Sequence, residues 1–167
     1  MAPVLVLIGS PGAGKSSVGR RVADRLGVRF VDTDQAVEAD AGLSVADNFV
    51  TMGEEEFRRL EADAVAKSLT DSGVVALGGG AVMRPDTQLL LAGQRVVWLK
   101  VGLGDAATRV GLNTARPLLL GNVRGTLSTL LAQRTPIYEA VSTDSIETSG
   151  RSVREVTEAV LELIADA

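Results

Sequence analysis

The sequence predicts a single α/β domain over residues 1–167, a three-layer αβα sandwich around a five-stranded parallel sheet. Five short apolar runs are typical of strands, and helical patterns lie between most of them, which is the signature of parallel βαβ units. A chain of 167 residues is long enough to bury one sizeable core. The predicted strands are residues 4–8, 28–31, 74–77, 95–99 and 144–148.

Helical patterns are clear in two of the intervening segments and in the segment after the last strand. Residues 16–26 follow the first strand, and in residues 53–69 and 153–164 apolar side chains recur every three or four residues, so that each helix buries one face. Ser152 and Glu155 form a capping box at the start of the last helix. The buried positions are Phe57, Leu60, Ala64, Leu69, Val153, Val156, Val160, Leu163 and Ile164.

A phosphate-binding motif follows the first predicted strand. Gly9, Gly14, Lys15 and Ser16 fit G-x-x-x-x-G-K-[ST], and the residues after them are helical, as the motif requires. Glycines let consecutive backbone N–H groups turn toward an anion, and the helix start directs its dipole at the same point. Lys15 is expected to reach the β- and γ-phosphates, and the Ser16 hydroxyl to complete a magnesium shell.

The composition excludes several other classes of chemistry. Cysteine and histidine are absent, so disulfides and thiolate chemistry are excluded and any acid–base work falls to Asp, Glu, Lys or Tyr. A net charge of −4 argues against a nucleic-acid surface. No apolar stretch is long enough to span a bilayer, and the N-terminus lacks the basic region of a signal peptide. A cytoplasmic protein without membrane partners is therefore expected.

Positive charge is concentrated in one stretch. No acidic residue lies between Asp105 and Glu139, and this interval indicates an anion-handling region. Within it, residues 111–125 contain three glycines and no clear period, which predicts a mobile loop. The arginines of the stretch are Arg109, Arg116, Arg124 and Arg134.

Polar and flexible residues follow the second and third predicted strands. The carboxyl ends of parallel strands are where ligands bind in such sheets, and Asp32 and Asp34 come directly after the second strand. Asp34 is predicted to cap the next helix and to accept a hydrogen bond from a hydroxyl substrate as its base, and Asp32 to lie in the outer coordination shell of the metal. Three consecutive glycines, residues 78–80, predict a backbone that something approaches closely.

Arg58 and Glu61 lie three residues apart on the predicted helix 53–69 and can pair. Two interpretations of this pair remain open. They form a surface ion pair of little energetic value, or Arg58 projects from the helix edge into a cleft.

Taken together, these segments resemble the shikimate kinase family over essentially the whole chain. The resemblance rests on "GSPGAGKSS", "DTD" at 32–34, "FRRLE" at 57–61, "GGG" at 78–80, "RPLL" at 116–119 and "QRTPIYEAV" from Gln133. It implies the P-loop kinase type of fold, with a lid at about 111–124 and a shikimate-binding region at about 33–61. The implied reaction is transfer of the ATP γ-phosphoryl group to the 3-hydroxyl of shikimate, with Mg²⁺ as cofactor and a monomer as the working unit.

The resemblance also implies roles for individual residues. Lys15, Asp34 and Arg116 would be catalytic, and Ser16 would bind the metal. ATP would be bound by Gly12, Ala13, Gly14, Lys15, Ser16, Ser17, Arg109, Arg116 and Arg151. Shikimate would be bound by Asp34, Arg58, Glu61, Gly78, Gly79, Gly80 and Arg134.

Two other functions compete with this one. Gluconate kinase has the same phosphate loop and also phosphorylates a polyol carboxylate, and a nucleotide-dependent regulatory protein would need no acceptor at all. The segment after Arg151 departs from the family pattern, because "SV" stands where a proline is expected two residues on.

Overall fold

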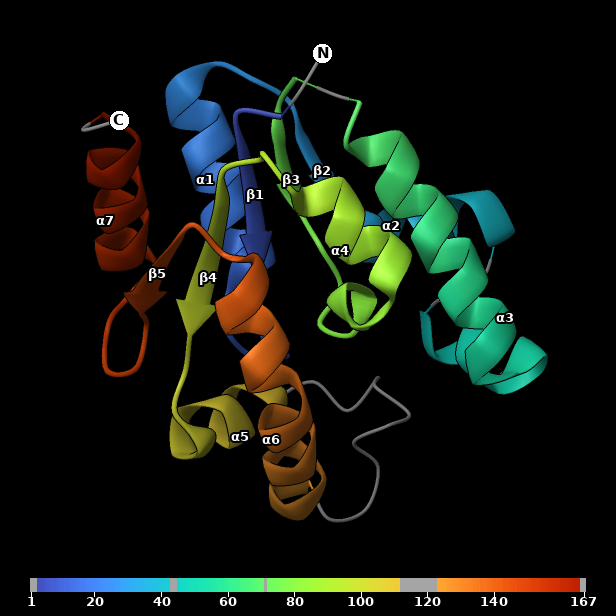
Figure 1. Cartoon of the computed structure of the whole chain (residues 1–167). Coiled ribbons are helices and arrows are strands. Elements are labelled where there is room, and N and C mark those ends of the chain that lie inside the picture. The colour runs from blue at the N-terminus through green and yellow to red at the C-terminus, as the bar shows by residue number, and fades with distance from the viewer. Residues whose placement is uncertain (1–2, 43–44, 71, 112–122, 166–167) are drawn as a thin grey trace.

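The computed structural model describes residues 3–42, 45–70, 72–111 and 123–165 (Figure 1). Five strands form one parallel sheet in the order β2-β3-β1-β4-β5, which confirms the predicted fold class. The strands are β1 (Leu5–Ile8), β2 (Phe30–Asp32), β3 (Val74–Ala76), β4 (Val96–Lys100) and β5 (Asp144–Glu147).

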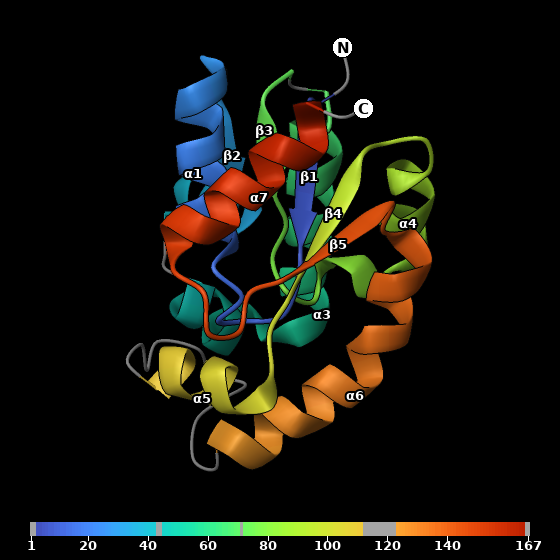
Figure 2. The same cartoon turned by 90° about the vertical axis from the view of Figure 1, so that its left-hand side faces the viewer.

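Helices cover both faces of this sheet. Helices α1 and α7 lie against one face, and α3, α4 and α6 lie on the other side (Figure 2). None of the helices among the described residues is long and apolar enough to cross a membrane. The helices are α1 (Lys15–Leu26), α2 (Thr33–Ala41), α3 (Val45–Ser68), α4 (Pro85–Leu91), α5 (Leu103–Gly111), α6 (Val123–Val141) and α7 (Val153–Ala165), with a 3₁₀ turn η1 (Ala81–Met83).

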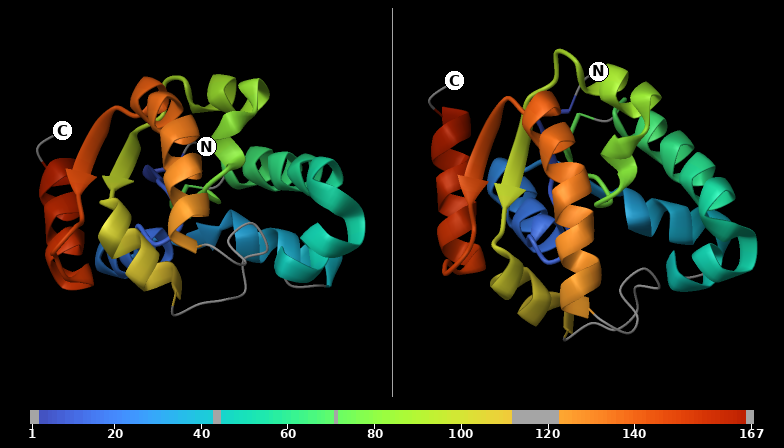
Figure 3. Two further views of the ribbon diagram at one scale, coloured as in Figure 1. Left: turned by 90° about the horizontal axis from the view of Figure 1, so that it is seen from below. Right: turned by 60° about the horizontal axis from the view of Figure 1, so that its bottom comes forward.

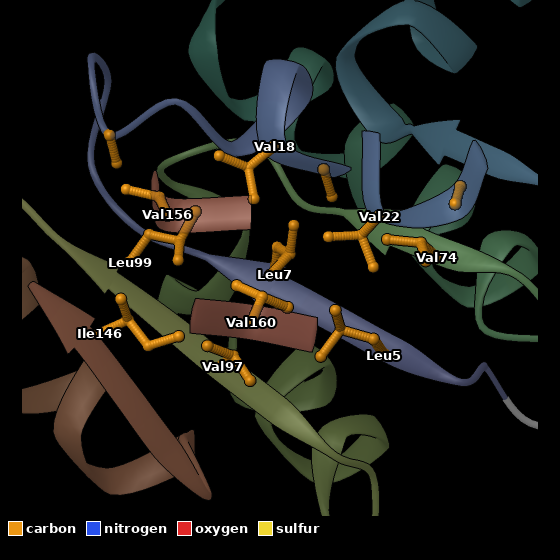
Figure 4. Packing of buried hydrophobic residues seen from close by; sticks show 13 residues of the cluster. Leu5, Leu7, Val18, Val22, Val74, Val97, Leu99, Ile146, Val156 and Val160 are labelled. Carbon is orange, nitrogen blue, oxygen red and sulfur yellow. The ribbon is translucent and has the colours of Figure 1, made fainter. Parts of the chain in front are cut away.

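The central strand β1 shows why two helical layers are needed. Its four side chains are all buried, and successive side chains of a strand point to opposite faces. Leu5 and Leu7 pack with the side chains of α1 and α7, as Figure 4 shows, whereas Val6 and Ile8 pack with those of α3, α4 and α6. A continuous apolar run such as "LVLI" is typical of a strand covered on both faces.

Two of the predicted helices are confirmed, and the residues at which they begin are well defined. The N–H of Glu155 donates to Ser152 Oγ at 3.1 Å and the N–H of Ser152 donates to Glu155 Oε1 at 3.1 Å, so the capping box of α7 is formed. In α3 the helix predicted at 53–69 follows a break at Gly53, whose φ of +83° is not helical. The side chains of Phe57, Ala64 and Leu69 are buried, as expected from the pattern.

The predicted loop at 111–125 needs a correction at both ends. Gly111 is the last residue of α5, and α6 already begins at Val123. The start of α6 is held because Leu127 is fully buried against Ala106 of α5, which a pattern interrupted by Gly125 does not reveal. Most of the predicted lid, residues 112–122 with Arg116, lies outside the described residues, and so does the side chain of Arg124.

The carboxyl ends of the strands bring the predicted site segments together at one edge of the sheet. The phosphate-binding motif follows β1, Asp32 ends β2, and the three glycines follow β3. Figure 3 views the molecule from this edge, where α5 and the first half of α6 also lie. This is the edge at which open parallel sheets bind their ligands.

Candidate active site

The loop between β1 and α1 has the backbone that its glycines predict. Gly12 and Gly14 have φ values of +83° and +87°, in the left-handed region that favours glycine. A Cβ on Gly9 would lie 2.7 Å from the carbonyl oxygen of Leu99, so strand β4 leaves no space for a side chain there. No side chain caps the start of α1, and the positive end of its helix dipole faces the phosphate loop.

The side chain of Lys15 is held against this loop by backbone carbonyl groups of the loop. Its Nζ donates to the carbonyl oxygens of Gly9 at 2.8 Å and Ser10 at 3.1 Å. An ammonium group in this position adds positive charge to a concave loop already lined by amide N–H groups. The arrangement suits a polyphosphate.

Asp32 joins the phosphate loop to the next helix. Its Oδ1 accepts from the N–H groups of Asp34 at 2.9 Å and Gln35 at 3.3 Å, and its Oδ2 accepts from the Ser16 hydroxyl. The prediction that Asp34 caps the helix is therefore wrong, because Asp32 is the N-cap of α2 and Asp34 lies in the first turn. The correction matters, since the Asp34 side chain does not cap the helix and instead lines the pocket over the phosphate loop.

A pocket lies over the phosphate loop and extends to both aspartates. Its polar lining suits phosphate groups at the end formed by Lys15 and Ser16, and a hydroxyl at the end formed by Asp34. The described residues that line it are Pro11, Gly12, Gly14, Lys15, Ser16, Ser17, Asp32, Asp34, Ala76, Leu77 and Arg109.

The three glycines after β3 are surrounded by the charged residues that the sequence singles out. A Cβ on Gly78 would lie 2.6 Å from both Asp34 Oδ1 and Glu61 Oε2, and one on Gly80 would lie 2.7 Å from Arg58 Nη2. On Gly79 it would lie 3.1 Å from Arg134 Nη1. Side chains from α2, α3 and α6 therefore meet over a bare backbone, and any residue larger than glycine would fill the space between them.

Glu61 and Arg58 form a buried ion pair rather than a surface one. Glu61 Oε1 lies 2.7 Å from Arg58 Nη1, and the side chain of Glu61 is only 2% exposed. Burial raises the pKa of Glu61 and the nearby Asp34 carboxylate raises it further, whereas Arg58 and Arg134 oppose the shift. The surface alternative for this pair is thus excluded, and the guanidinium of Arg58 lies against Gly80.

Arg134 enters the same cluster from α6 and is 5% exposed. Burial lowers the pKa of its guanidinium, and the Tyr138 hydroxyl beside it opposes that shift. No carboxylate among the described residues forms an ion pair with it, and a guanidinium buried so deeply is suited to pair with an anionic ligand.

A second pocket lies on the other side of the phosphate loop, toward α7. Arg109 reaches it from α5 and donates to the carbonyl oxygens of Gly12 at 2.9 Å and Thr148 at 3.2 Å. Arg151, whose side chain donates to the Glu147 carbonyl oxygen at 3.1 Å, lines the same pocket. The remaining lining residues are Gly12, Ala13, Gly14, Ser17, Val18, Thr148, Ser152, Val153 and Val156.

Comparison with known proteins identifies the family of this chain. The family model described as "Shikimate kinase" matches residues 11–165. The shikimate kinase of Thermobifida fusca is 54% identical over 159 residues, which are 95% of this chain and 92% of that protein. The chain belongs to the shikimate kinase family. ATP-dependent phosphorylation of shikimate is therefore its activity, and the gluconate kinase and regulatory alternatives are excluded.

Other shikimate kinases agree in sequence and in fold. The enzyme of Salinispora arenicola is 50% identical over 166 residues, which are 99% of this chain and 99% of that protein. The solved structure of the shikimate kinase from Acinetobacter baumannii in complex with shikimate has a TM-score of 0.94 and 31% identity, and covers 99% of this chain and 94% of that one. The fold of a shikimate kinase is thus preserved along the full chain.

Sequence reasoning missed two residues that shape the site. The Thr33 hydroxyl accepts from the N–H of Gly78 at 3.0 Å, and the Tyr138 hydroxyl donates to the Gly79 carbonyl oxygen at 2.6 Å. Both lie inside quoted motifs, Thr33 between the aspartates and Tyr138 four positions after Arg134. That spacing, one helical turn from a site arginine, was the available signal for Tyr138.

Proposed function

We propose that the phosphate loop binds the ATP phosphates while Asp34, Arg58 and Arg134 bind shikimate directly beside them. The observation that carries this proposal is the position of Asp34. Its side chain lines the pocket over the phosphate loop, and its carboxylate also lies against Gly78 in the cluster with Glu61. A hydroxyl held by Asp34 is therefore next to the γ-phosphate that it attacks, as phosphoryl transfer requires.

Asp34 acts as hydrogen-bond acceptor and base for the 3-hydroxyl of shikimate. The chain has no histidine, so a carboxylate is the natural group for this task. Phosphoryl transfer depends more on position and on charge stabilisation than on a strong base. Lys15 provides that stabilisation on the phosphate side, together with the amide N–H groups of the loop.

Arg58 and Arg134 form a clamp for the shikimate carboxylate. Their guanidinium groups lie against neighbouring glycines, Gly80 and Gly79, although they come from different helices. A planar guanidinium makes paired, charge-assisted hydrogen bonds with a carboxylate. Glu61 orients Arg58 for this role through their ion pair of 2.7 Å, and Gly78 gives the substrate room beside it.

Magnesium fits the residues at the other end of the pocket. Ser16 offers a hydroxyl, and the carboxylate of Asp32 accepts from that hydroxyl. Mg²⁺ keeps several waters and takes further ligands from substrate phosphates, so one hydroxyl with a carboxylate behind it is a sufficient protein contribution. When bound, the ion neutralises charge on the transferring phosphoryl group. Ser16 would ligate it, and Asp32 would orient Ser16.

Arg109 and Arg151 are placed to flank the adenine of ATP. Both line the pocket between the phosphate loop and α7, and Arg109 is fixed to the loop through Gly12. Arg116 remains a proposal from the family resemblance, as a lid residue that contacts the phosphates and helps to exclude water.

A monomer in the cytoplasm is the expected working form. Light scattering of the purified enzyme at micromolar concentration tests this, and a dimer as the active species would contradict it.

The proposal is tested by measuring ADP release with shikimate, with gluconate and without acceptor. Release should require shikimate, and Lys15→Ala should abolish it while the protein still melts cooperatively. Near-normal turnover in the folded Lys15→Ala variant would contradict the assignment of the phosphate loop.

A further inference from the structure

The hydroxyl of Tyr138 lies where the two binding elements for shikimate meet. It donates to the carbonyl oxygen of Gly79 at 2.6 Å. The side chain of Arg134, one turn earlier on α6, lies beside this hydroxyl and opposes the rise of its pKa. A phenol both donates and accepts, so this single oxygen can accept from a site arginine while it donates to the site backbone.

The ring and the hydroxyl of Tyr138 have separate surroundings. The ring packs in the core with Trp98, at 5.7 Å between ring centroids, and the residue is 1% exposed. The hydroxyl reaches the polar cluster. Because burial raises the pKa of Tyr138 to about 12, the hydroxyl keeps its proton at neutral pH and remains the donor to Gly79.

Fixing the Gly79 carbonyl also fixes the next amide. The peptide bond is planar and trans, so the N–H of Gly80 points away from the side on which Tyr138 holds the carbonyl oxygen. Within the part of the chain that the structure describes, the N–H of Gly80 donates no hydrogen bond, although the residue is buried. Buried N–H groups are nearly always paired, so we expect this donor to bind a ligand oxygen.

The same turn is held from its other side by Thr33. The N–H of Gly78 donates to Thr33 Oγ1 at 3.0 Å, and the N–H of Ala81 donates to the Gly78 carbonyl oxygen at 3.0 Å. These bonds hold the beginning of the turn and leave the orientation of the Gly79–Gly80 peptide to Tyr138. Glycines have the least intrinsic preference for one orientation, so an external contact is needed here.

We propose that Tyr138 is a positioning residue for shikimate, whose hydroxyl holds the Arg134 guanidinium and the Gly79–Gly80 peptide in the geometry that binds the substrate. The inference rests on the proposed role of Arg134 in binding the shikimate carboxylate. It adds a residue that does not touch the reacting atoms and acts through two groups that contact the substrate.

Tyr138→Phe tests the proposal because it removes the hydroxyl and keeps the ring against Trp98. The KM for shikimate should rise by about ten-fold, the scale of one lost hydrogen bond to a charged or buried group, while the KM for ATP changes by less than two-fold. The matched control is Ser68→Ala, which removes a buried hydroxyl that donates to the Ala64 carbonyl oxygen at 2.7 Å on α3. The control should lose stability without any change in either KM.

A double-mutant cycle with Arg134→Lys separates a positioning role from a merely structural one. If Tyr138 acts partly through Arg134, its removal should raise the KM for shikimate by a smaller factor in the Arg134→Lys background than in wild type. Independent multiplication of the two effects, or a KM for shikimate within two-fold of wild type in Tyr138→Phe, would overturn the proposal.

Thermal shifts produced by shikimate give a second readout that compares each variant with its own unliganded form. Tyr138→Phe should show a smaller shikimate-induced shift than wild type, and an equal shift would also overturn the proposal. If Arg134→Lys itself leaves the KM for shikimate unchanged, the proposed carboxylate clamp fails. An effect of Arg134→Lys without any effect of Tyr138→Phe would contradict the positioning role alone.

Discussion

At the scale of single residues, Asp34 is the group on which both halves of the proposed site depend. It lies in the first turn of α2, and its carboxylate is beside Gly78 and near Glu61. The neighbouring Asp32 takes the structural task of capping the helix. Two carboxylates two positions apart thus have different roles, which are set by the direction in which each side chain points.

Asp34→Asn should separate chemistry from folding. Turnover should fall by roughly two or more orders of magnitude, the scale of general-base effects, because the amide keeps the shape and loses the charge. The melting temperature should hardly change, since Asp32 remains to cap α2. The measurement pairs kcat with thermal unfolding of the same sample. Equal losses of activity and stability would assign Asp34 a structural role.

Some of these residues could be predicted from the sequence and others could not. Lys15 and Ser16 follow from local spacing, because the loop and helix that position them are contiguous in the chain. The role of Arg58 depends on the burial of Glu61, which is set by packing between α2 and α3. Tyr138 was missed because its partner Gly79 is 59 positions away, and only the folded chain brings them together.

At the scale of elements, Asp32 couples the start of α2 to the start of α1. One carboxylate oxygen holds the first amides of α2, and the other accepts from Ser16 in the first turn of α1. Any change of this side chain therefore acts on a helix end and on the proposed metal site at once. The two effects can be separated by the choice of substitution.

Asp32→Asn and Asp32→Ala should differ in stability and agree in activity. The Asn variant keeps an N-cap, whereas the Ala variant should lose about 1 kcal/mol of unfolding free energy. Both should need more Mg²⁺ for half-maximal activity, by roughly 10- to 100-fold, because Ser16 loses its carboxylate partner. Denaturant unfolding measures the loss of stability, and a magnesium titration measures the Mg²⁺ concentration for half-maximal activity. Wild-type magnesium dependence of Asp32→Asn would exclude the carboxylate from the metal site.

Elements with a regular pattern were predictable, and elements defined by tertiary contacts were not. All five strands and the helices α1 and α7 follow from local apolar patterns. The start of α6 does not, because "VRGTL" contains a glycine and the anchor is the contact of Leu127 with Ala106 on α5. In α3 the predicted start at residue 53 coincides with the break at Gly53, whereas the helical residues before the break, from Val45, have no clear pattern in the sequence.

At the scale of the whole molecule, the parallel sheet brings residues that are distant in the sequence, from Lys15 to Arg134, to one edge of the fold. The central strand β1 is buried by helices on both faces, so the loops at its carboxyl end rest on a rigid support. The cost is a buried acidic group, Glu61, beneath the proposed shikimate site. The burial of this carboxyl predicts how the unfolding free energy depends on pH.

The unfolding free energy of wild type relative to Glu61→Gln should decrease as the pH rises above about 4.5. The pKa of Glu61 is raised in the folded protein from a value of 4.5, chiefly by burial, so the folded state binds a proton more tightly than the unfolded state. Stability is thus highest below 4.5 and is lost as the pH rises through the folded pKa. Denaturant unfolding of both proteins from pH 4 to 8 measures the difference. A difference that increases with pH would contradict the raised pKa.

The central claim is that Arg58 and Arg134 hold the carboxylate of shikimate, and a cycle of enzyme variants against substrate analogues tests it most directly. With shikimate, Arg58→Ala and Arg134→Ala should each lower kcat/KM by roughly 30-fold to several thousand-fold, since a partly desolvated charge loses its partner. The KM for ATP should stay near the wild-type value. With an analogue whose carboxylate is replaced by a neutral amide, wild type should be a poor catalyst, and the penalty of either substitution should nearly vanish. If both variants lose as much activity on the amide as on the acid, these arginines do not hold the carboxylate.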